Sequence, residues 1–304
     1  MKKLIIAGGT GFLGNSLINY FKNQFDEIII LSRHSKSNKN NVKYILWDAE
    51  NLDEWKKEFE NAELVINLCG KSVDCRYTKK NKALIFSSRL NSTSAIGKAI
   101  TQCENPPLVW INAASATIYK HSEDKPNTET DGEFGNGFSV EVCKAWEKMF
   151  NEISLPKTRK INLRITMVMG KGGGVFPVLN NLTKKYLGGA MGSGHQFVSW
   201  IHETDFCRLI EWCVNNKNAN GNYNCAAPNP IRNKEMMQLF RKQNNIKFGL
   251  PASKWMLEIG AFFIGTETEL VLKSRNVIPD RATKEGFEIK FKDMESCVKD
   301  LSEK

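Results

Sequence analysis

Short apolar segments alternate with longer amphipathic segments through the first half of the chain. The apolar segments are rich in isoleucine, leucine and valine, as in KLIIAG (residues 3–8), EIIILS (27–32) and ELVINLCG (63–70). The segments between them, such as LGNSLINYFKNQF (13–25), space their apolar residues at the helical period. Strands joined by helices pair in parallel through right-handed crossovers. The pattern therefore predicts an α/β fold built on a Rossmann doubly wound parallel sheet.

The pattern changes after residue 165. Two glycine-rich segments appear, GKGGG (170–174) and LGGAMGSG (187–194), and helical spacing returns in KWMLEIGAFFIG (254–265) and ETELVLKSRNVI (267–278). These features predict a smaller, mostly helical substrate and C-terminal domain beside the sheet. The expected organisation is an NADP-binding Rossmann core at 1–165, substrate-side segments interleaved with it at 166–245, and a small C-terminal domain at 246–304.

A long polar segment, HSEDKPNTETDGEFGNG (121–137), follows the fifth apolar segment. Long polar loops in compact domains are usually functional or disordered. We interpret this one as an active-site loop over the carboxyl edge of the sheet.

The composition is that of a soluble globular protein. The chain has 304 residues, of which 41% are hydrophobic and 25% charged, and no apolar run approaches the roughly 20 residues of a membrane span. Eight cysteines occur without a C-x-x-C motif or a His/Cys cluster, which favours reduced thiols and predicts no metal site. We therefore expect a cytoplasmic protein without a membrane partner.

The net charge of +10 raises the question of nucleic-acid binding. The lysines are scattered and interleaved with acidic residues, and no arginine-rich helix or stripe of basic and aromatic residues occurs. A solvated lysine-rich surface is the favoured interpretation, and no nucleic-acid partner is expected. The excess positive charge favours attraction of a phosphate-bearing ligand.

The segment AGGTGFLG (7–14) carries the strongest motif. It contains Gly9-x-Gly11-x-x-Gly14 between the first predicted strand and the first predicted helix. Glycines at this turn let the backbone approach a pyrophosphate, which lies against the positive end of the helix dipole. The predicted dinucleotide contacts of this loop are Gly8, Gly9, Thr10, Gly11, Phe12, Leu13 and Gly14.

The end of the second predicted strand indicates which dinucleotide is bound. An acidic residue there would bind a ribose 2′-hydroxyl and repel a 2′-phosphate, but the chain has Ser32 and Arg33. A hydroxyl and a guanidinium suit a phosphate dianion, so NADP(H) is favoured over NAD(H), with an ordinary surface arginine as the alternative for Arg33. Further predicted cofactor contacts are Asp48 for the adenine, Asn67, Leu68, Cys69 and Gly70 for the adenosine side, and Arg89 and Arg164.

Several sequence words together resemble the short-chain dehydrogenase/reductase superfamily in its extended, epimerase-like form, and more closely its atypical epimerase-family branch. These words are GGTGFLG, NLCGKSVDCRYT, SSRLNST, CKAWE, LRITMVMGKGGG, GGAMGSGHQFVSWIHETD and SRNVIPDRATKEGFEIKF. They cover nearly the whole chain, and the last resembles a small C-terminal domain of unknown function. The resemblance also implies, as a family habit, a homodimer.

The resemblance implies catalysis by a serine, a tyrosine and a lysine, in which the lysine cation lowers the pKa of the tyrosine phenol. Ser115 matches the family serine, but Ser139 and Cys143 stand at the tyrosine and lysine positions. Lys144 cannot substitute, because one residue turns a helix by roughly 100°. Cys143 is interpreted as a packing residue, with a thiol nucleophile as the less favoured alternative.

Other groups must then manage the proton if the protein is an enzyme. Tyr119, near the end of the fifth predicted strand, is the favoured candidate, and Tyr77, Arg76 and His202 are others. For each of them a packing or surface role stands as the alternative. Candidate substrate contacts, which lie where extended members of the superfamily bind substrate, are Arg76, Gln196, Trp200 and His202, with Gly172–Gly174 as an anion seat or a hinge.

The sequence thus predicts an NADP(H)-dependent oxidoreductase with a small-molecule substrate. In one version of the hypothesis, this substrate carries a phosphate or sugar-nucleotide group. Ser115 would orient the carbonyl or hydroxyl group. The alternative, motivated by the missing tyrosine and lysine, is a catalytically silent NADPH sensor or scaffold. Sugar-nucleotide epimerisation in the usual manner is less favoured, because it needs a base at position 139.

Overall fold

The computed structural model describes residues 1–258 and 267–303, and its centre is a seven-stranded parallel sheet in the order β11-β6-β5-β4-β1-β2-β3. The chain adds strands outward from β1 in one direction and then in the other, which confirms the predicted doubly wound topology. The strands are β1 (Lys3–Ala7), β2 (Glu27–Ser32), β3 (Val42–Leu46), β4 (Leu64–Asn67), β5 (Val109–Asn112), β6 (Arg159–Ile165) and β11 (Gly221–Cys225).

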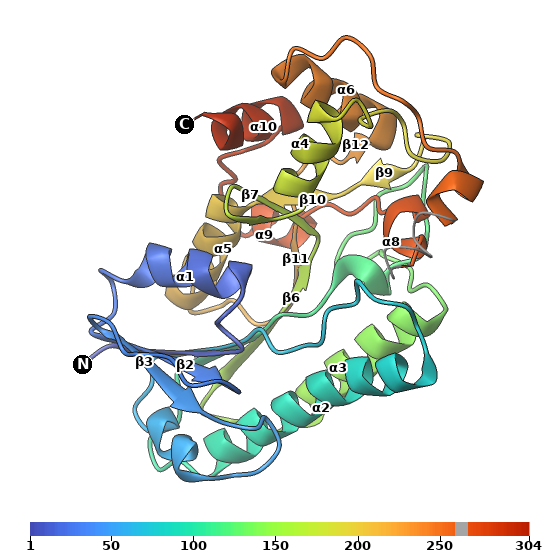
Figure 1. The fold of residues 1–304 in the computed structure, drawn as a ribbon. Coiled ribbons are helices and arrows are strands. Elements are labelled where there is room, and N and C mark those ends of the chain that lie inside the picture. The colour runs from blue at the N-terminus through green and yellow to red at the C-terminus, as the bar shows by residue number, and fades with distance from the viewer. Residues whose placement is uncertain (259–266, 304) are drawn as a thin grey trace.

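Helices cover both faces of this sheet (Figure 1). Leu4 and Ile6 of β1 pack with α1 and α5, whereas Ile5 packs with α2, α3 and the short helix η1. Both faces of β1 are buried, which explains its continuous apolar run. Burial of each such side chain contributes roughly 1.5–3 kcal/mol to stability. The helices are α1 (Phe12–Phe21), η1 (Glu54–Phe59), α2 (Lys79–Thr101), α3 (Phe138–Glu152) and α5 (Glu203–Asn215).

A second part of the molecule lies beside α1 and α5 and has its own apolar core (Figure 1). Trp200, Met237, Phe240 and Phe291 are buried in this core. No helix that the structure describes is long and apolar enough to span a bilayer. The remaining elements are η2 (Ala116–Ile118), β7 (Met167–Gly170), β8 (Gly173–Gly174), α4 (Phe176–Lys184), β9 (Phe197–Val198), β10 (Trp200–His202), β12 (Ile231–Arg232), α6 (Asn233–Gln243), α8 (Glu269–Leu272), α9 (Asp280–Lys284) and α10 (Met294–Ser302).

Four asparagines form a row across neighbouring strands of the main sheet. Asn67, Asn112, Asn162 and Asn222 occupy paired positions on β4, β5, β6 and β11. Each amide donates to the next, over 3.0, 3.1 and 3.2 Å, and the first three side chains are fully buried. A slip of one residue would leave buried amides unpaired, so this asparagine row fixes the register of the four strands.

The C-terminal part departs from the predicted helices. Of the expected helix over 267–278, only Glu269–Leu272 is helical. Of the helix predicted over 254–265, residues 259–265 lie outside the described residues. Residues 273–278, named here the C-terminal strap, are instead mostly extended. The amide of Arg275 donates to Phe197 O at 2.9 Å, and the amide of Asn127 donates to Asn276 O at 2.7 Å. Hydrogen bonds to neighbouring loops thus override the helical spacing of the apolar residues.

We expect Asn112→Ala to destabilise the protein by about 2–4 kcal/mol, because it leaves a buried donor on Asn67 and a buried acceptor on Asn162 without their partner. Urea unfolding followed by circular dichroism measures the loss. Asn222→Ala is the matched control at the half-buried end of the asparagine row and should cost less. Equal losses in the two variants would contradict a register-fixing role for the buried part of the row.

Candidate functional site

The turn after β1 brings backbone amides to an open helix end. Gly8 has a φ of 74°, and a Cβ atom on Gly14 would lie 2.1 Å from Gly9 O, so the helix is packed directly on the turn. A Cβ atom on Gly11 would meet nothing within 4 Å. The first turn of α1 has neither a side-chain cap nor an acidic residue. Unpaired N–H groups and the helix dipole therefore face open space, which fits a pyrophosphate.

Phe12, the first residue of α1, connects this turn to the second part of the molecule. Cβ atoms on Gly170 and Gly173 would lie 2.2 and 2.6 Å from atoms of its ring. The glycine-rich segment was expected to be an anion seat or a hinge. The structure shows that two of its glycines make room for Phe12, because any larger residue would collide with the ring.

Ser32 and Arg33 end β2 at the same edge of the sheet. Ser32 is buried and its Oγ accepts from the amide of His34 at 3.2 Å, while Arg33 is exposed. Asp48, in the loop after β3, accepts from the amides of Glu50 and Asn51, both at 2.8 Å. Its carboxylate thereby fixes the shape of its own loop.

Arg89 of α2 packs against the loop after β4. A Cβ atom on Gly70 would lie 3.0 Å from Arg89 Cζ, and the guanidinium donates to Lys71 O at 3.1 Å. Asn67 Oδ1 accepts from the amide of Cys69 at 3.0 Å, and burial raises the pKa of Cys69 to about 12. Leu68 packs against the main core. The loop is held rigidly where it would meet a dinucleotide.

Arg164 and Tyr119 are engaged in a buried network. Arg164 makes a bidentate pair with Glu147 of α3, with two contacts of 2.8 Å, and also donates to the hydroxyl of Tyr119 at 2.7 Å. That hydroxyl donates to Asn224 at 2.8 Å, and the Tyr119 side chain is 2% exposed. Sequence reasoning assigned Arg164 to the cofactor and Tyr119 to proton transfer. These contacts favour a structural role for both.

Three predicted substrate contacts are likewise buried and engaged. Gln196 donates to Met191 O at 2.8 Å, and Trp200 donates to Asn229 O at 3.2 Å. His202 accepts at Nδ1 from the first turn of α5 and stacks on Phe291 with ring centroids 3.8 Å apart, and burial lowers its pKa. Arg76, the fourth, lies at the surface 3.4 Å from Glu267. The geometry favours structural roles for the first three.

The serine, tyrosine and lysine positions of the resemblance meet at the carboxyl edge of the sheet. Ser115 caps η2 by accepting from Thr117 N at 3.2 Å, and its side chain acts on the pKa of the neighbouring Cys143 thiol. Burial nevertheless raises the pKa of Cys143 to about 11, so the thiol is neutral at pH 7. It is therefore neither a cation nor a ready nucleophile.

A tyrosine and a lysine from other elements lie beside these positions. The hydroxyl of Tyr77, from the loop before α2, is 3.1 Å from Ser139 Oγ. Ser139 also donates to Glu269 Oε2 of α8 at 3.2 Å. Lys273 Nζ is 4.0 Å from Glu269 Oε1 and donates to Thr117 O at 3.2 Å. Sequence reasoning considered Tyr77 but missed Glu269 and Lys273, because no local motif brings the C-terminal residues to this edge.

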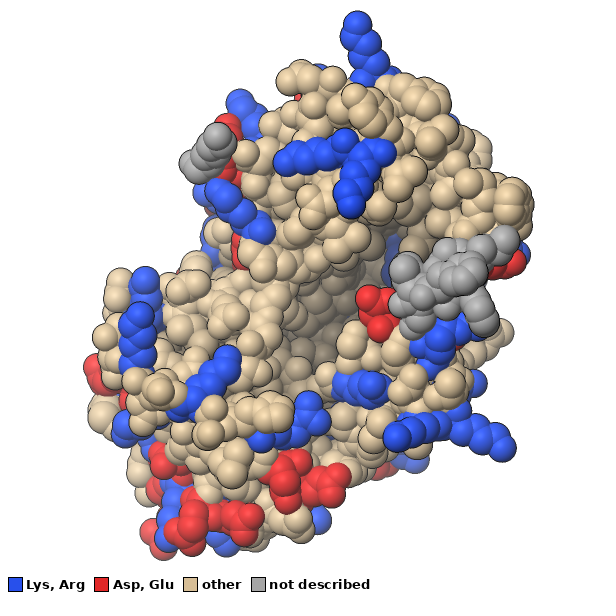
Figure 2. Space-filling view, viewed as in Figure 1, with Lys and Arg blue, Asp and Glu red and all other residues tan. Residues whose placement is uncertain are grey.

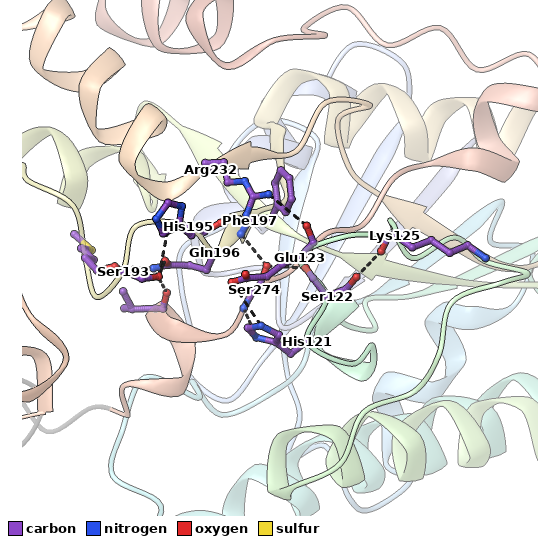
Figure 3. A network of polar contacts seen from close by, with 12 residues as sticks. His121, Ser122, Glu123, Lys125, Ser193, His195, Gln196, Phe197, Arg232 and Ser274 are labelled. Atoms are coloured by element: carbon purple, nitrogen blue, oxygen red, sulfur yellow. Dashed lines mark hydrogen bonds and ion pairs between the residues drawn. The ribbon is translucent and has the colours of Figure 1, made fainter.

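The strap is held beside the 121–137 loop by a polar network (Figure 3). The amide of Ser274 donates to His121 Nδ1 at 3.1 Å, and its hydroxyl donates to Ser122 O at 2.7 Å. The same hydroxyl accepts from the amide of Phe197 at 2.8 Å. Ser274 therefore joins three separate segments, and the strap becomes part of the wall of the site.

Figure 2 shows a deep hollow between the part that holds the main sheet and the part that holds α4, α6 and α10.

Within residues 1–258 and 267–303, no group of three or more His, Cys, Asp and Glu side chains is arranged to hold a metal ion. All eight cysteines are free thiols.

Comparisons with known proteins match both parts of the chain. Residues 4–226 match the NAD dependent epimerase/dehydratase family, and residues 252–301 match a domain of unknown function, DUF1731. The epimerase family protein YfhF of Bacillus subtilis is 29% identical over 299 residues, covering 98% of this chain and 97% of its own. The epimerase family protein SERP0438 of Staphylococcus epidermidis is 30% identical over 303 residues, covering 99% of each chain.

Solved structures agree with this assignment. The human epimerase family protein SDR39U1, crystallised with NADPH, has a TM-score of 0.87 at 26% identity and covers 99% of each chain. A UDP-N-acetylglucosamine 4-epimerase from Bacillus cereus has a TM-score of 0.76 at 16% identity, with 99% of this chain and 96% of its own covered, and shows the fold alone. The family resemblance predicted from the sequence words is confirmed: the chain belongs to the NAD dependent epimerase/dehydratase family and carries a C-terminal DUF1731 domain.

Proposed function

We propose that the protein is an NADP(H)-dependent oxidoreductase that acts on the carbonyl or hydroxyl group of a small molecule. The observation that carries the proposal is the uncapped end of α1 behind the glycine turn, with Arg33 in place of an acid at the end of β2. The presence of NADPH in the human relative's structure supports it. The cofactor supplies a hydride when bound.

The residues of the site fit this cofactor in three places. Backbone amides at the start of α1 would bind the pyrophosphate, and Ser32 with Arg33 would bind the 2′-phosphate. Asp48 and the loop after Asn67 would flank the adenosine. Arg89 would act from beneath that loop, since its guanidinium supports the backbone at Gly70.

Ser115 would orient the substrate oxygen in this proposal. Its hydroxyl lies at the carboxyl edge of the sheet beside the Cys143 thiol, where a hydrogen bond to the substrate oxygen would stabilise charge in the transition state. The net charge of +10 favours a substrate that carries a phosphate group. Two proteins of the same fold are a UDP-N-acetylglucosamine 4-epimerase and a protein solved with UDP-glucose and NAD, and a sugar-nucleotide substrate is one version of the proposal.

A catalytically silent NADPH sensor or scaffold is the second candidate. Ser139 and Cys143 at the tyrosine and lysine positions favour it, because the neutral Cys143 thiol cannot replace a lysine cation. Standard sugar-nucleotide epimerisation is disfavoured for the same reason, since Ser139 is a poor base. An enzyme and a sensor differ in turnover and share cofactor binding.

Arg33→Ala should weaken NADPH binding at least tenfold, about 1.4 kcal/mol, and leave NADH binding nearly unchanged, because only NADPH carries the 2′-phosphate. Nicotinamide fluorescence titrations with both nucleotides measure this. Lys22→Ala is the matched control, because it removes the same charge as Arg33→Ala from an exposed position after α1. Equal binding of NADPH by wild type and Arg33→Ala would sink the phosphate assignment, and no binding of either nucleotide would sink the cofactor assignment.

Ser115→Ala should lower the rate of NADPH oxidation with a carbonyl substrate on the order of a hundredfold, because it removes a donor to the substrate oxygen. NADPH affinity should change less than twofold. A panel of aliphatic and aromatic aldehydes, ketones and α-dicarbonyls, followed by absorbance at the nicotinamide band, tests this. A wild-type protein that binds NADPH tightly and stays silent across the panel would favour the sensor.

A further inference from the structure

The position left by the family tyrosine is next to another tyrosine. Ser139 is 8% exposed, and its hydroxyl is 3.1 Å from the hydroxyl of Tyr77. Tyr77 lies on the loop between β4 and α2, whereas Ser139 lies in the first turn of α3. A phenol thus reaches the missing tyrosine's position from a different element.

Both the ring and the backbone of Tyr77 have fixed partners. Its ring packs edge-on against Phe138 with centroids 4.8 Å apart, and Phe138 packs in turn on Phe86 of α2. The backbone amide of Tyr77 donates to Glu267 Oε1 at 2.8 Å. Such fixed geometry is what proton transfer needs, because a general acid must be positioned before the reaction.

A chain of polar groups leads from the phenol toward solvent. Ser139 Oγ donates to Glu269 Oε2 at 3.2 Å, and the Glu269 side chain is 36% exposed. Glu269 and Lys273 also line a cavity of about 800 Å³ whose opposite wall is the loop at 120–136. The path therefore runs from phenol to hydroxyl to carboxylate to water.

Two cations of the C-terminal strap act on the same position. Lys273 is only 11% exposed at its side chain, and its charge acts on Cys143, the residue at the lysine position. Arg275 of the strap interacts electrostatically with Tyr77 and with Glu269. The C-terminal domain thus brings positive charge to the place from which the family lysine is missing.

We propose that Tyr77 is the catalytic acid and base of this site, that Ser139 and Glu269 relay its proton to solvent, and that Lys273 replaces the charge of the family lysine. This proposal rests on the proposed oxidoreductase function. In reduction, the carbonyl carbon gains a hydride from NADPH and the oxygen takes the proton of the Tyr77 hydroxyl. The Glu269 carboxylate takes up a proton from solvent and passes it to Ser139 as Ser139 gives its own proton to the phenolate, so the net change is the uptake of one proton from solvent. Oxidation reverses each transfer.

Tyr77→Phe should lower the turnover number about a hundredfold or more with less than a twofold change in NADPH affinity, because it removes the hydroxyl and keeps the ring packing on Phe138. Tyr186→Phe, which removes the hydroxyl of an exposed tyrosine, is the matched control. Steady-state kinetics and fluorescence titration give the two quantities, and urea unfolding checks that the variant is folded.

A second readout uses the protein without cofactor. Ultraviolet titration of tyrosine ionisation, taken as the difference between wild type and Tyr77→Phe, isolates Tyr77 among the six tyrosines. Burial raises the pKa of Tyr77, and the charges of Glu267, Glu269 and Cys75 add to the increase, while Arg89 and Arg275 are the cations that face it. Glu269→Gln should therefore shift the Tyr77 ionisation to lower pH. An unshifted ionisation would break the proposed relay.

Lys273→Met should also lower turnover, and Lys273→Arg should restore most of it, because the charge and not the length of the side chain is what the proposal requires. If Lys273 were merely structural, Lys273→Arg would not restore turnover while NADPH affinity stayed unchanged. Equal turnover in Lys273→Met and wild type would overturn the role of Lys273.

The failures of the two proposals are distinct. A wild type that turns over, a Ser115→Ala variant that does not, and a Tyr77→Phe variant that keeps more than half of the rate would overturn the assignment of Tyr77 alone. A wild type that binds NADPH and reduces no carbonyl compound would overturn the oxidoreductase proposal, and the relay with it.

Discussion

The buried asparagine row holds the strands in the register on which the site depends. Asn67 and Asn112 are the last residues of β4 and β5, so the loops that follow leave the sheet at the same height. The row also reaches the helices, because Asn162 donates to Asn151 of α3 and Asn67 donates to Thr93 of α2. One hydrogen-bonded system therefore positions both the loops that follow β4 and β5 and the helices that carry Arg89, Ser139 and Cys143. Breaking any hydrogen bond in such a buried system leaves a polar group unpaired at a cost in free energy. The carboxyl edge is therefore rigid.

Two further connections join that edge to the rest of the molecule. The Phe12 ring occupies the space that two glycines of the β7–β8 hairpin leave open, so the first turn of α1 is packed directly on the second part of the molecule. On the opposite side, Ser274 of the C-terminal strap joins the 121–137 loop to β9. Backbone groups of the strap are satisfied by hydrogen bonds to Phe197 of β9 and to Asn127 of the 121–137 loop. The C-terminal domain is thus a structural component of the site.

The sequence was sufficient for the sheet and the glycine turn, because both depend on local patterns. Strand periods and Gly9-x-Gly11-x-x-Gly14 are readable without tertiary contacts. The helix predicted over 267–278 was wrong, since the amides of Arg275 and Ile278 donate to Phe197 of β9 and Asn127 of the 121–137 loop, and the spacing of apolar residues contains no information about those partners. For the same reason the burial of Arg164, Gln196 and Trp200 was not foreseen. A polar residue after a strand looks identical in sequence whether it meets a ligand or a buried partner such as Glu147.

A proton donor need not come from the element that carries the family tyrosine. A proton donor is defined by where its oxygen lies and which charges surround it, and its place in the chain is free to change. Ser139 is too short to reach a substrate as a tyrosine would, but a short side chain leaves room for the Tyr77 ring, whose hydroxyl it contacts. Cys143 is neutral and buried, whereas a lysine at that position would add a cation beside Arg89 and Lys273, whose charges already act there. Like charges in a buried site raise its free energy, so a neutral residue at position 143 is compatible with the nearby charges of Arg89 and Lys273.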